Sequence, residues 1–406
     1  MENSLGKIQI DDKVYFAELQ TNLNDVFNLK ILEFEYTGRI KIDICIGFFE
    51  NFGEITLVAG TIGSGSVGGL EIHTFKFKYF IKGVHFLKIE DIKANIINFE
   101  SEILKKVFPD SIIDFEGNHK ELPRKPVKLV DSSGIKVNYY NGKRTSWERK
   151  LKYTVIQYKY LNVKHLGGAI NVWDLCRLLD RIKDLFYLIG FSDNGSDIYT
   201  FVYYNGRIKK YFELFGWNYK IKPSRFTYFK TNNLNFLELI SSNSIYEWIF
   251  NEEYQKLFRL LFEKHFLKIH HRELSFINSV YVLERFHRKF IAEKASFDKR
   301  IKYFRSLFEK LLPERIDVNN YLNKIERTRH NISHFEDKTN VFKGIELYYA
   351  SLYVEIVIVI SLLEKIGVRP EQILNLTAFS QKHIDDMFIN NNNMEFNFPS
   401  KMFKSS

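Results

Sequence analysis

The sequence predicts an α+β protein in which a strand-rich N-terminal domain with a few helices precedes an all-helical bundle. Before about residue 240, short segments alternate apolar and polar residues with a period of two, which is typical of half-buried strands. After that point, apolar residues recur every three or four positions in four successive segments, as in amphipathic helices. The chain has 406 residues, of which 45% are apolar, so it is too long for one ordinary core and long enough for two.

Strands are expected through the first 240 residues, joined by a small number of helices. The alternation predicts strands at residues 7–10, 40–46, 75–79, 152–158 and 198–204. Apolar spacings of three and four predict helices at residues 89–108 and 171–189. The glycine-rich residues 60–69 lack the Gly-Lys-Ser/Thr ending of a phosphate-binding loop, so we interpret them as a flexible hairpin or inter-strand loop.

Four successive helices with short links are predicted to form a bundle in the C-terminal part of the chain. Their apolar seams span residues 276–290, 297–311, 318–332 and 345–366, and a further helix at residues 245–266 precedes them. Asp317 is placed to cap the third of the four. We therefore expect a strand-rich domain at residues 1–240, a bundle of four to five helices at 245–382, and a flexible polar tail at 383–406.

Cysteine content and hydropathy favour a cytoplasmic protein. Two cysteines, Cys45 and Cys176, cannot build a disulfide framework or a cysteine-based zinc site. The N-terminus has no basic start followed by an apolar core, so no signal peptide is expected. The most apolar run, residues 350–363, is about 14 residues long and contains Glu355, so we expect a buried helix and no membrane association.

The charge distribution favours an anionic partner. The chain carries a net charge of +10, and residues 259–329 contain 17 Lys and Arg against 9 Asp and Glu. A basic face concentrated in one part of the chain is what a phosphate-bearing ligand requires. The alternative is a lysine-rich surface that contacts only solvent.

Three polar residues, His287, Arg329 and Glu355, occupy positions on the otherwise apolar seams. A buried arginine is rare unless it is paired, so Arg329 is expected to contact a carboxylate, a phosphate or a subunit interface. Glu355 lies on the inward seam of the adjacent helix, which predicts an Arg329–Glu355 contact. The alternative is that Glu355 faces solvent.

The segment from Arg329 to His334 holds the candidate site residues. His330 and His334 lie four residues apart, so an unbroken helix stacks them on one face, with Arg327 near the same face. Arg329 and His334 lie five residues apart, about 140° around an ideal helix. They converge on one ligand only if the helix frays or ends near Ser333, or if two chains pair with their sites facing each other.

This combination of side chains suits metal-free cleavage of RNA. The 2′-hydroxyl attacks the adjacent phosphorus and leaves a 2′,3′-cyclic phosphate and a free 5′-hydroxyl. Histidine titrates near neutrality and can take or give the proton, and arginine matches the geometry of the phosphoryl oxygens. Neither role needs a metal or a cofactor, and the sequence has no carboxylate or cysteine cluster spaced to hold a metal. A symmetric dimer would supply a base from one chain and an acid from the other.

The helical half resembles the HEPN ribonucleases, whose hallmark is Arg-x4–6-His with a polar residue after the arginine. Here the motif is Arg329-His330-Asn331-Ile332-Ser333-His334. More narrowly, the segments Phe276-Ile-Asn-Ser-Val-Tyr-Val-Leu-Glu-Arg-Phe-His-Arg288 and Ile325-Glu-Arg-Thr-Arg329 resemble the ApeA-like HEPN domain. The N-terminal half is similar to the strand-rich domain of ApeA through its glycine-rich loop, Gly69-Leu-Glu-Ile72 and Phe80-Ile-Lys-Gly-Val-His-Phe86.

The resemblance implies a dimeric, metal-independent endoribonuclease that acts in prokaryotic anti-phage defence by abortive infection. Arg329 and His334 would be the catalytic pair, supported by His330, Asn331, Arg327 and Glu355. His330 takes the position where asparagine is more usual, so its role stays open. The RNA partner would be a tRNA or an mRNA. The N-terminal domain would sense a phage-derived trigger or restrain the nuclease.

Two other functions are compatible with the sequence. A non-catalytic HEPN module would use the basic bundle to bind RNA or a protein. Alternatively, the strand-rich domain binds a carbohydrate or peptide in a groove lined by Trp147, Trp173 and Trp217, and the bundle only dimerises. If the chain is a toxic nuclease, we expect the N-terminal domain or the link at residues 335–342 to cover the site before infection.

Overall fold

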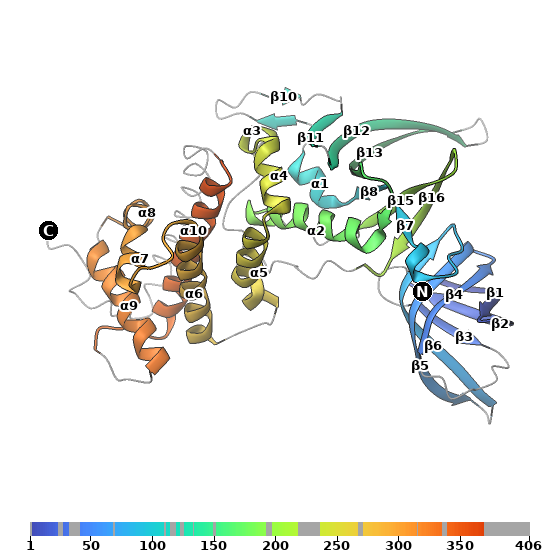
Figure 1. Cartoon of the computed structure of the whole chain (residues 1–406), viewed down its shortest axis with the longest axis horizontal. Helices are drawn as coiled ribbons and strands as arrows, with labels where there is room; N and C mark the ends of the chain where they lie inside the picture. The colour runs from blue at the N-terminus through green and yellow to red at the C-terminus, as the bar shows by residue number, and fades with distance from the viewer. Residues whose placement is uncertain are drawn as a thin grey trace. The chain divides into compact units, whose positions relative to one another are not determined.

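The computed structural model describes most of the chain in two compact units. The described residues are 2–22, 27–31, 41–67, 70–108, 111–113, 119–121, 126–132, 134–148, 152–191, 197–217, 236–266, 271–314, 316–334 and 339–368. One unit comprises residues 1–105, 122–180 and 194–219, and the other comprises 106–121, 181–193 and 220–406. The first is rich in strands and the second in helices, which confirms the predicted α+β class (Figure 1). The expected tail at residues 383–406 lies outside the described residues.

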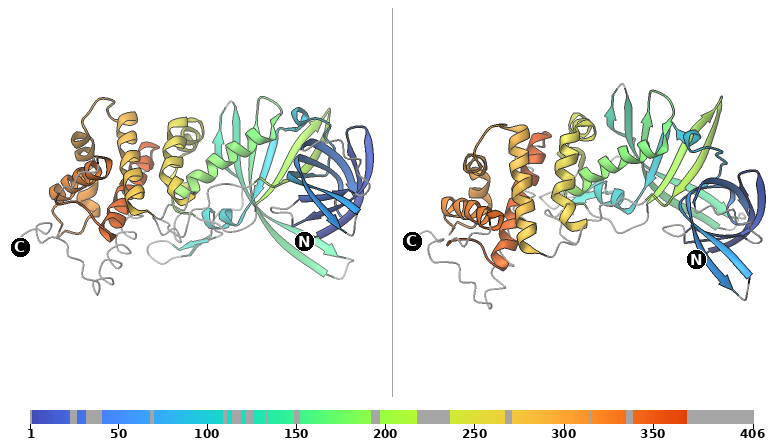
Figure 2. Two further views of the ribbon diagram at one scale, coloured as in Figure 1. Left: turned by 90° about the horizontal axis from the view of Figure 1, so that it is seen from below. Right: turned by 60° about the horizontal axis from the view of Figure 1, so that its bottom comes forward.

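Six antiparallel strands form a closed barrel at the start of the chain. They are β1 (Glu2–Ile10), β2 (Lys13–Thr21), β3 (Phe27–Ile31), β4 (Lys41–Phe49), β5 (Gly53–Val67) and β6 (Leu70–Lys82). Figure 2 shows these strands, in blue, curled into a barrel. The neighbours run in the order β6-β3-β2-β1-β4-β5, and β5 pairs with β6 as well. That last pairing closes the ring, so each described strand of the barrel has a neighbour on both sides.

Apolar side chains that alternate along these strands fill the barrel. The expected strands at residues 7–10, 40–46 and 75–79 lie in β1, β4 and β6, apart from residue 40, which lies outside the described residues. Along the second half of β4, Cys45, Gly47 and Phe49 are buried while Phe48 between them is exposed, as a period of two requires. The barrel core consists of Ile8, Ile10, Ala17, Leu19, Phe27, Leu29, Ile31, Ile42, Cys45, Phe49, Phe52, Ile55, Leu57, Phe75, Phe77 and Phe80.

The glycine-rich segment is strand rather than loop as far as Val67. Residues 60–67 continue β5 and pair with β6 up to the Val67–Leu70 pair, so they form one arm of a hairpin. The hairpin interpretation is confirmed for these residues, and the flexible inter-strand loop is wrong for them. A Cβ atom at Gly60 would lie 2.4 Å from the ring of Phe77, which explains one glycine by close packing.

The sheet continues beyond the barrel through β16 (Ile208–Phe215), which pairs with β6. Its remaining strands are β15 (Ile198–Asn205), β8 (Ile96–Glu100), β13 (Lys152–His165), β12 (Ile135–Glu148) and β11 (Val127–Asp131). Helix α2 (Val172–Leu188) follows β14 (Ile170–Asn171), and α2 confirms the helix predicted at 171–189. Two short strands, β9 (Ser111–Ile113) and β10 (His119–Glu121), pair separately in the second unit.

The helix predicted at residues 89–108 is mostly wrong. The segment contains a 3-10 turn η1 (Ile89–Asp91), strands β7 (Lys93–Ala94) and β8, and only a short helix α1 (Glu102–Val107). β8 lies between two strands, with Phe99 paired to Leu161 of β13 and to Tyr199 of β15. A short apolar run fits a central strand as well as a buried helix, and pairing on both sides decided between them.

The second unit contains the predicted helical region. Its helices are α3 (Phe236–Leu239), α4 (Ser242–Phe250), α5 (Glu252–Phe266), α6 (Arg272–Phe290), α7 (Phe297–Tyr303), α8 (Arg305–Leu311), α9 (Val318–His334) and α10 (Ile345–Lys365). Two single helices were expected where the chain forms pairs. Asn251 separates α4 from α5 and caps α5, because its Oδ1 accepts the Glu253 amide at 3.0 Å. Phe304, with φ −87° and ψ 7°, separates α7 from α8.

Helix α10 is the buried centre of this unit. It is 21 residues long and apolar enough to cross a membrane by length and composition, so the expectation that this segment is too short is wrong. However, 83% of its apolar window is buried inside the protein. This burial is that of a core helix, as predicted, and α10 packs against α6, where Ser351 and Ser279 lie 2.9 Å apart between their hydroxyl oxygens.

Candidate functional site

Helix α9 carries the Arg329–His334 segment and begins at a capping residue. The Oδ1 atom of Asp317 accepts the amide of Asn319 at 3.0 Å, and its carbonyl accepts the amide of Tyr321 at 2.9 Å, which confirms the predicted N-cap. The helix then runs without a break to His334. Its buried face contains Tyr321, Leu322, Lys324, Ile325 and Thr328, so one side is fixed in the core while the other is available.

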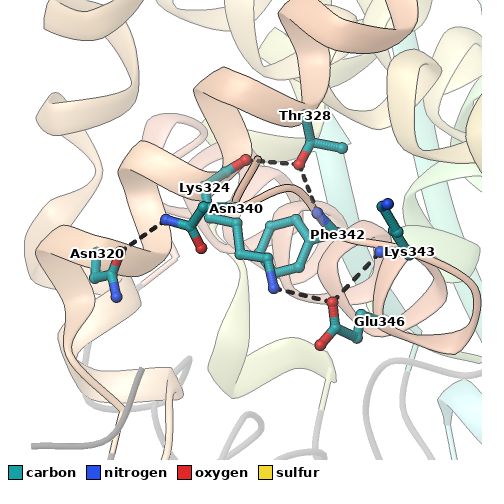
Figure 3. Close-up of polar contacts among 7 residues, drawn as sticks. All are labelled: Asn320, Lys324, Thr328, Asn340, Phe342, Lys343 and Glu346. Atoms are coloured by element: carbon teal, nitrogen blue, oxygen red, sulfur yellow. Dashed lines mark hydrogen bonds and ion pairs between the residues drawn. The ribbon is translucent and has the colours of Figure 1, made fainter. Parts of the chain in front are cut away.

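The chain that follows the motif returns to α9 and is hydrogen-bonded to it (Figure 3). Thr328 Oγ1 accepts the amide of Phe342 at 2.9 Å and donates to the carbonyl of Lys324 at 2.7 Å. Asn340 Nδ2 donates to Asn320 Oδ1 at 3.4 Å. The described part of the link, residues 339–342, therefore packs against Asn320 and Thr328, and Thr328 lies on a different face of α9 from His330 and His334. Residues 335–338 lie outside the described residues.

A buried ion pair joins α9 to α10. Lys324 Nζ lies 2.9 Å from Glu346 Oε2, and the side chains are 1% and 14% exposed. The ammonium group also lies 4.6 Å from the ring centroid of Phe342. Burial lowers the pKa of Lys324 more than the Glu346 carboxylate raises it. Sequence reasoning missed this pair, because Lys324 sits beside the seam residue Ile325 but not on the seam itself.

Arg329 contacts Glu284 rather than Glu355. Its Nη2 atom lies 3.2 Å from Oε2 of Glu284 on α6, and its Cζ atom lies 4.8 Å from the ring centroid of Phe297 at the start of α7. The predicted Arg329–Glu355 contact is wrong, because the guanidinium is directed to α6 and α7 instead of α10. Sequence reasoning gave Glu284 no role, although it follows Leu283 on the apolar seam of α6.

Glu355 is fully buried, so the alternative that it faces solvent is also wrong. Its Oε1 atom accepts hydrogen bonds from Ser279 Oγ at 2.7 Å and Ser351 Oγ at 2.8 Å, between α6 and α10. Burial, and then the Glu355 carboxylate, raise the pKa of Tyr348 to about 12. Glu355 is therefore part of a core polar network rather than a group that reaches a ligand.

The two histidines of the motif stack on the accessible face of α9. The ring centroids of His330 and His334 lie 4.4 Å apart, which confirms the predicted stacking. His334 and Arg327 are exposed, whereas His330 and Asn331 are half-buried. An exposed imidazole next to a second imidazole at a helix terminus can exchange protons with a bound substrate.

The unbroken helix keeps Arg329 and His334 apart within one chain. Their five-residue separation places the side chains about 140° apart around the axis. No contact joins them among the residues that the structure describes, and Arg329 is directed toward Glu284. The described helix ends at His334, directly after Ser333, so both predicted routes to convergence stay predictions.

His287, the third polar seam residue, is buried beside aromatic rings. Its ring lies 5.2 Å from that of Tyr303 and 6.2 Å from that of Phe304, centroid to centroid. Its Nδ1 atom has no hydrogen-bond partner within the described chain. Burial, and then the nearby Arg300 guanidinium, lower the pKa of His287, which keeps the imidazole neutral.

Of the three tryptophans predicted to line a groove, two lie side by side in the structure. Trp173 and Trp217 are half-buried and stack with ring centroids 5.9 Å apart, and Tyr79 lies 4.4 Å from Trp173. Trp217 Nε1 donates to Asp180 Oδ1 at 3.3 Å. The side chain of Trp147 lies outside the described residues.

Within the described residues, no group of three or more His, Cys, Asp or Glu side chains is placed to hold a metal ion.

Comparison with known protein families gave two matches that together span most of the chain. Residues 235–372 match the Apea-like HEPN domain, and residues 6–189 match the ApeA N-terminal domain 1. The first range covers α3 to α10 and therefore contains the whole Arg329–His334 segment. Comparison with curated proteins and comparison with solved structures each gave no match.

Proposed function

Because the chain is an ApeA-like HEPN protein, we propose that it is an endoribonuclease of prokaryotic anti-phage defence that acts by abortive infection. The observation that supports this most directly is the position of two side chains on α9. Arg329 has 34% of its side chain exposed and His334 is exposed, both near the C-terminal end of one helix in the HEPN domain. They supply a cation and one proton-transfer group, two of the three functions that metal-independent cleavage of a phosphodiester requires.

The proposed reaction transfers two protons and uses no metal ion. One imidazole takes the proton of the 2′-hydroxyl while O2′ bonds to phosphorus, and a second imidazole gives a proton to O5′ as the P–O5′ bond breaks. Arg329 stabilises the charge on the non-bridging oxygens. The products are a 2′,3′-cyclic phosphate and a 5′-hydroxyl end. His334 is the first candidate for either proton role, and His330, stacked on it, is the second.

A homodimer is the arrangement that best reconciles this chemistry with α9. Since the helix is unbroken to His334, one chain does not direct Arg329 and His334 to the same phosphate. Two chains related by a two-fold axis, with their α9 termini facing each other, would bring His334 of each chain to the same phosphodiester. We propose that the active form is such a dimer.

RNA is the proposed substrate, and the basic HEPN region supports it. The 17 Lys and Arg against 9 Asp and Glu in residues 259–329 favour a polyanion. We propose that a tRNA or an mRNA in the cytoplasm is cut. The ApeA N-terminal domain would respond to a phage-derived trigger and restrain cleavage before infection.

Sequencing of RNA ends tests the proposal. Cells that express the wild type or His334→Ala are compared with and without phage, and new 5′-hydroxyl ends are counted. We expect ends that require His334 and that increase on infection. His271→Ala is the matched control, because His271 is an exposed histidine at the start of α6 whose side chain makes no capping hydrogen bond. Equal numbers of ends from wild type and His334→Ala would refute the proposal.

A non-catalytic HEPN module is the second candidate, and the same variants separate the two. Both functions predict RNA affinity that falls steeply with salt. If purified wild-type protein cuts no cellular RNA, even from infected cells, but binds RNA as tightly as His334→Ala, the binding module is favoured. The ion pair between Arg329 and Glu284 is compatible with either function.

Restraint by the N-terminal domain is testable with a chain that starts near residue 245. Such a chain lacks Phe236. It also lacks Arg181, so the indole N–H of Trp248 loses the carbonyl oxygen to which it donates at 2.7 Å. The fragment must therefore first be shown to be folded by circular dichroism and gel filtration. A folded fragment that is harmless while the infected full-length chain is toxic would contradict restraint.

A further inference from the structure

The sheet beyond the barrel carries a cluster of tyrosines on one face (Figure 1). Tyr140 of β12 and Tyr160 of β13 are cross-strand partners, and their rings stack with centroids 4.9 Å apart and planes 11° from parallel. Tyr158 points to the same face, and its ring centroid lies 5.8 Å from that of Tyr160. These three side chains are half-buried, whereas Tyr139 and Leu161, which alternate with them along the strands, are buried. The tyrosines therefore lie on the solvent side of the sheet.

Gly142 gives Tyr158 room to lean across the sheet. The two residues are cross-strand partners, and a Cβ atom at position 142 would lie 2.4 Å from Cζ and from the hydroxyl oxygen of Tyr158. The far end of the ring therefore occupies the space that a side chain at this position would fill. A larger residue would displace the ring, so the arrangement of the tyrosines depends on this glycine.

Two carboxylates lie on the same face as the tyrosines. Glu100 at the end of β8 is exposed, and Glu213 of β16 is half-buried. Burial, and then the Glu213 carboxylate, raise the pKa of Glu100. Burial, then the two tyrosines beside it, and then Glu100 and Tyr211 of β16 raise the pKa of Tyr160, so groups from several strands converge on that ring. We call this set the tyrosine face: Tyr140, Tyr158, Tyr160, Tyr211, Glu100 and Glu213.

Lys209 shows how a cation binds to this face. Its Nζ atom lies 4.9 Å from the ring centroid of Tyr211, and a hydrogen bond to the Tyr211 hydroxyl raises the pKa of Lys209. No lysine or arginine of the described residues forms an ion pair with Glu100 or Glu213, including Lys82, the cross-strand neighbour of Glu213. Nor does one of the described cations lie over the other three rings of the face. Most of the tyrosine face is thus able to accept a cation from another molecule.

We propose that the tyrosine face binds a basic segment of a partner protein through an arginine side chain that contacts the rings and the two carboxylates. Charge complementarity selects this partner, because ring faces attract a guanidinium and carboxylates accept its N–H groups. RNA is a poorer fit, since the carboxylates repel phosphates. The inference goes beyond cleavage at α9, and its test needs no nuclease activity.

Isothermal titration calorimetry of the full-length protein tests this surface. The probe is a nine-residue peptide of alternating arginine and glycine with both ends blocked, at physiological salt. We expect the wild type to bind it and Tyr160→Ala to bind it roughly 3- to 30-fold more weakly, because a cation–π contact is lost. Tyr160→Phe should stay within about twofold of the wild type, because the ring face remains. Glu100→Gln should weaken binding roughly threefold, as expected for an exposed ion pair.

Tyr281→Ala and Glu90→Gln are the matched controls. Tyr281 on α6 and Glu90 in η1 are exposed and lie outside the tyrosine face, so both variants should bind like the wild type. Circular dichroism and unfolding temperatures show whether each variant is folded. If Tyr160→Ala does not fold, Glu100→Gln decides, because glutamine keeps the size of the side chain and removes only its charge.

Three outcomes would overturn the inference. The wild type might fail to bind the peptide even at millimolar concentration. Equal affinity of the wild type, Tyr160→Ala and Glu100→Gln would mean that the peptide binds elsewhere. A nine-nucleotide single-stranded RNA that loses affinity in Tyr160→Ala, while the peptide does not, would make this face a nucleic-acid surface instead.

Discussion

The imidazole rings of His330 and His334 lie 4.4 Å apart on the accessible face of α9, one helical turn from each other. Thr328, on another face of the same helix, accepts the backbone amide of Phe342 in the core. The helix is thus anchored on one side while it presents two titratable groups on another. Any proton transfer to a substrate at this face has a second imidazole next to the first.

Removing His334 should separate cleavage from binding. We expect His334→Ala to lower the cleavage rate by about 10²–10⁴, the usual contribution of a general acid or base. Affinity for a 2′-O-methyl RNA should change less than about twofold, because His334 is one exposed group on a basic surface. Gel-based cleavage and anisotropy are the measurements, with His271→Ala as control. Full activity of His334→Ala would rule out its catalytic role.

Breaking the Lys324–Glu346 pair should destabilise the helical unit. Lys324→Ala leaves a largely buried carboxylate unpaired and should cost about 3–5 kcal/mol, measured as a lower unfolding temperature in scanning fluorimetry. Lys302→Ala, which breaks an exposed pair with Asp298, should cost less than about 1 kcal/mol. Because burial lowers the pKa of Lys324, replacing both Lys324 and Glu346 by methionine should leave the free energy of unfolding nearly unchanged. A much lower unfolding temperature in the double variant would show that the ion pair itself stabilises the fold.

The hydrogen bonds to Glu355 should contribute to the stability of the fold and should not affect the rate of RNA cleavage. Ser279→Ala removes one of the two serine hydroxyls that donate to Oε1 and should cost about 1–3 kcal/mol, since the carboxylate is fully buried. Ser296→Ala, at a helix N-cap without a side-chain hydrogen bond, is the control. The folded Ser279→Ala protein should retain wild-type kcat. A selective loss of kcat without destabilisation would restore a functional role to Glu355.

His287 should make stability depend on pH below about 6.5, its usual pKa. The pKa of the folded state is lowered, so as the pH falls the unfolded chain binds a proton that the folded chain resists. Stability is therefore present above that pH and is lost below it, by at most about 1.4 kcal/mol per pH unit. Replacement of His287 by phenylalanine should flatten the fall in unfolding temperature between pH 7.5 and 5.5. His271→Gln should keep the wild-type slope.

Local patterns predicted the helices and strands where one period dominated. Spacings of three and four located α6, α9 and α10, and alternation located β1, β4 and β6, because each has one apolar face. Breaks at Asn251 and Phe304 were missed, since the apolar spacing continues across both positions. Barrel closure by β5 and β6 was missed too, because strand order depends on contacts distant in sequence.

The site shows the same division between local and distant information. Stacking of His330 on His334 follows from helical spacing alone. The partner of Arg329 does not, because α10 and α6 both offer a carboxylate to a central arginine. The direction that the side chain takes from α9 selects Glu284, and helix-to-helix orientation is not encoded in a seam pattern.

The closed ring of β1 to β6 limits the ways in which the N-terminal domain would bind the proposed trigger. Each described strand of that ring pairs with two neighbours, but the pairing is staggered, so segments such as residues 62–67 of β5 pair on one side only. A ligand that docks as an added strand, a common way for a sheet to capture a peptide of arbitrary sequence, therefore has only short staggered segments of this ring to pair with. If the ring binds the proposed trigger, outward side chains such as the exposed Phe16 and Phe48 would supply most of the contact, so binding should be sensitive to point changes in the ligand.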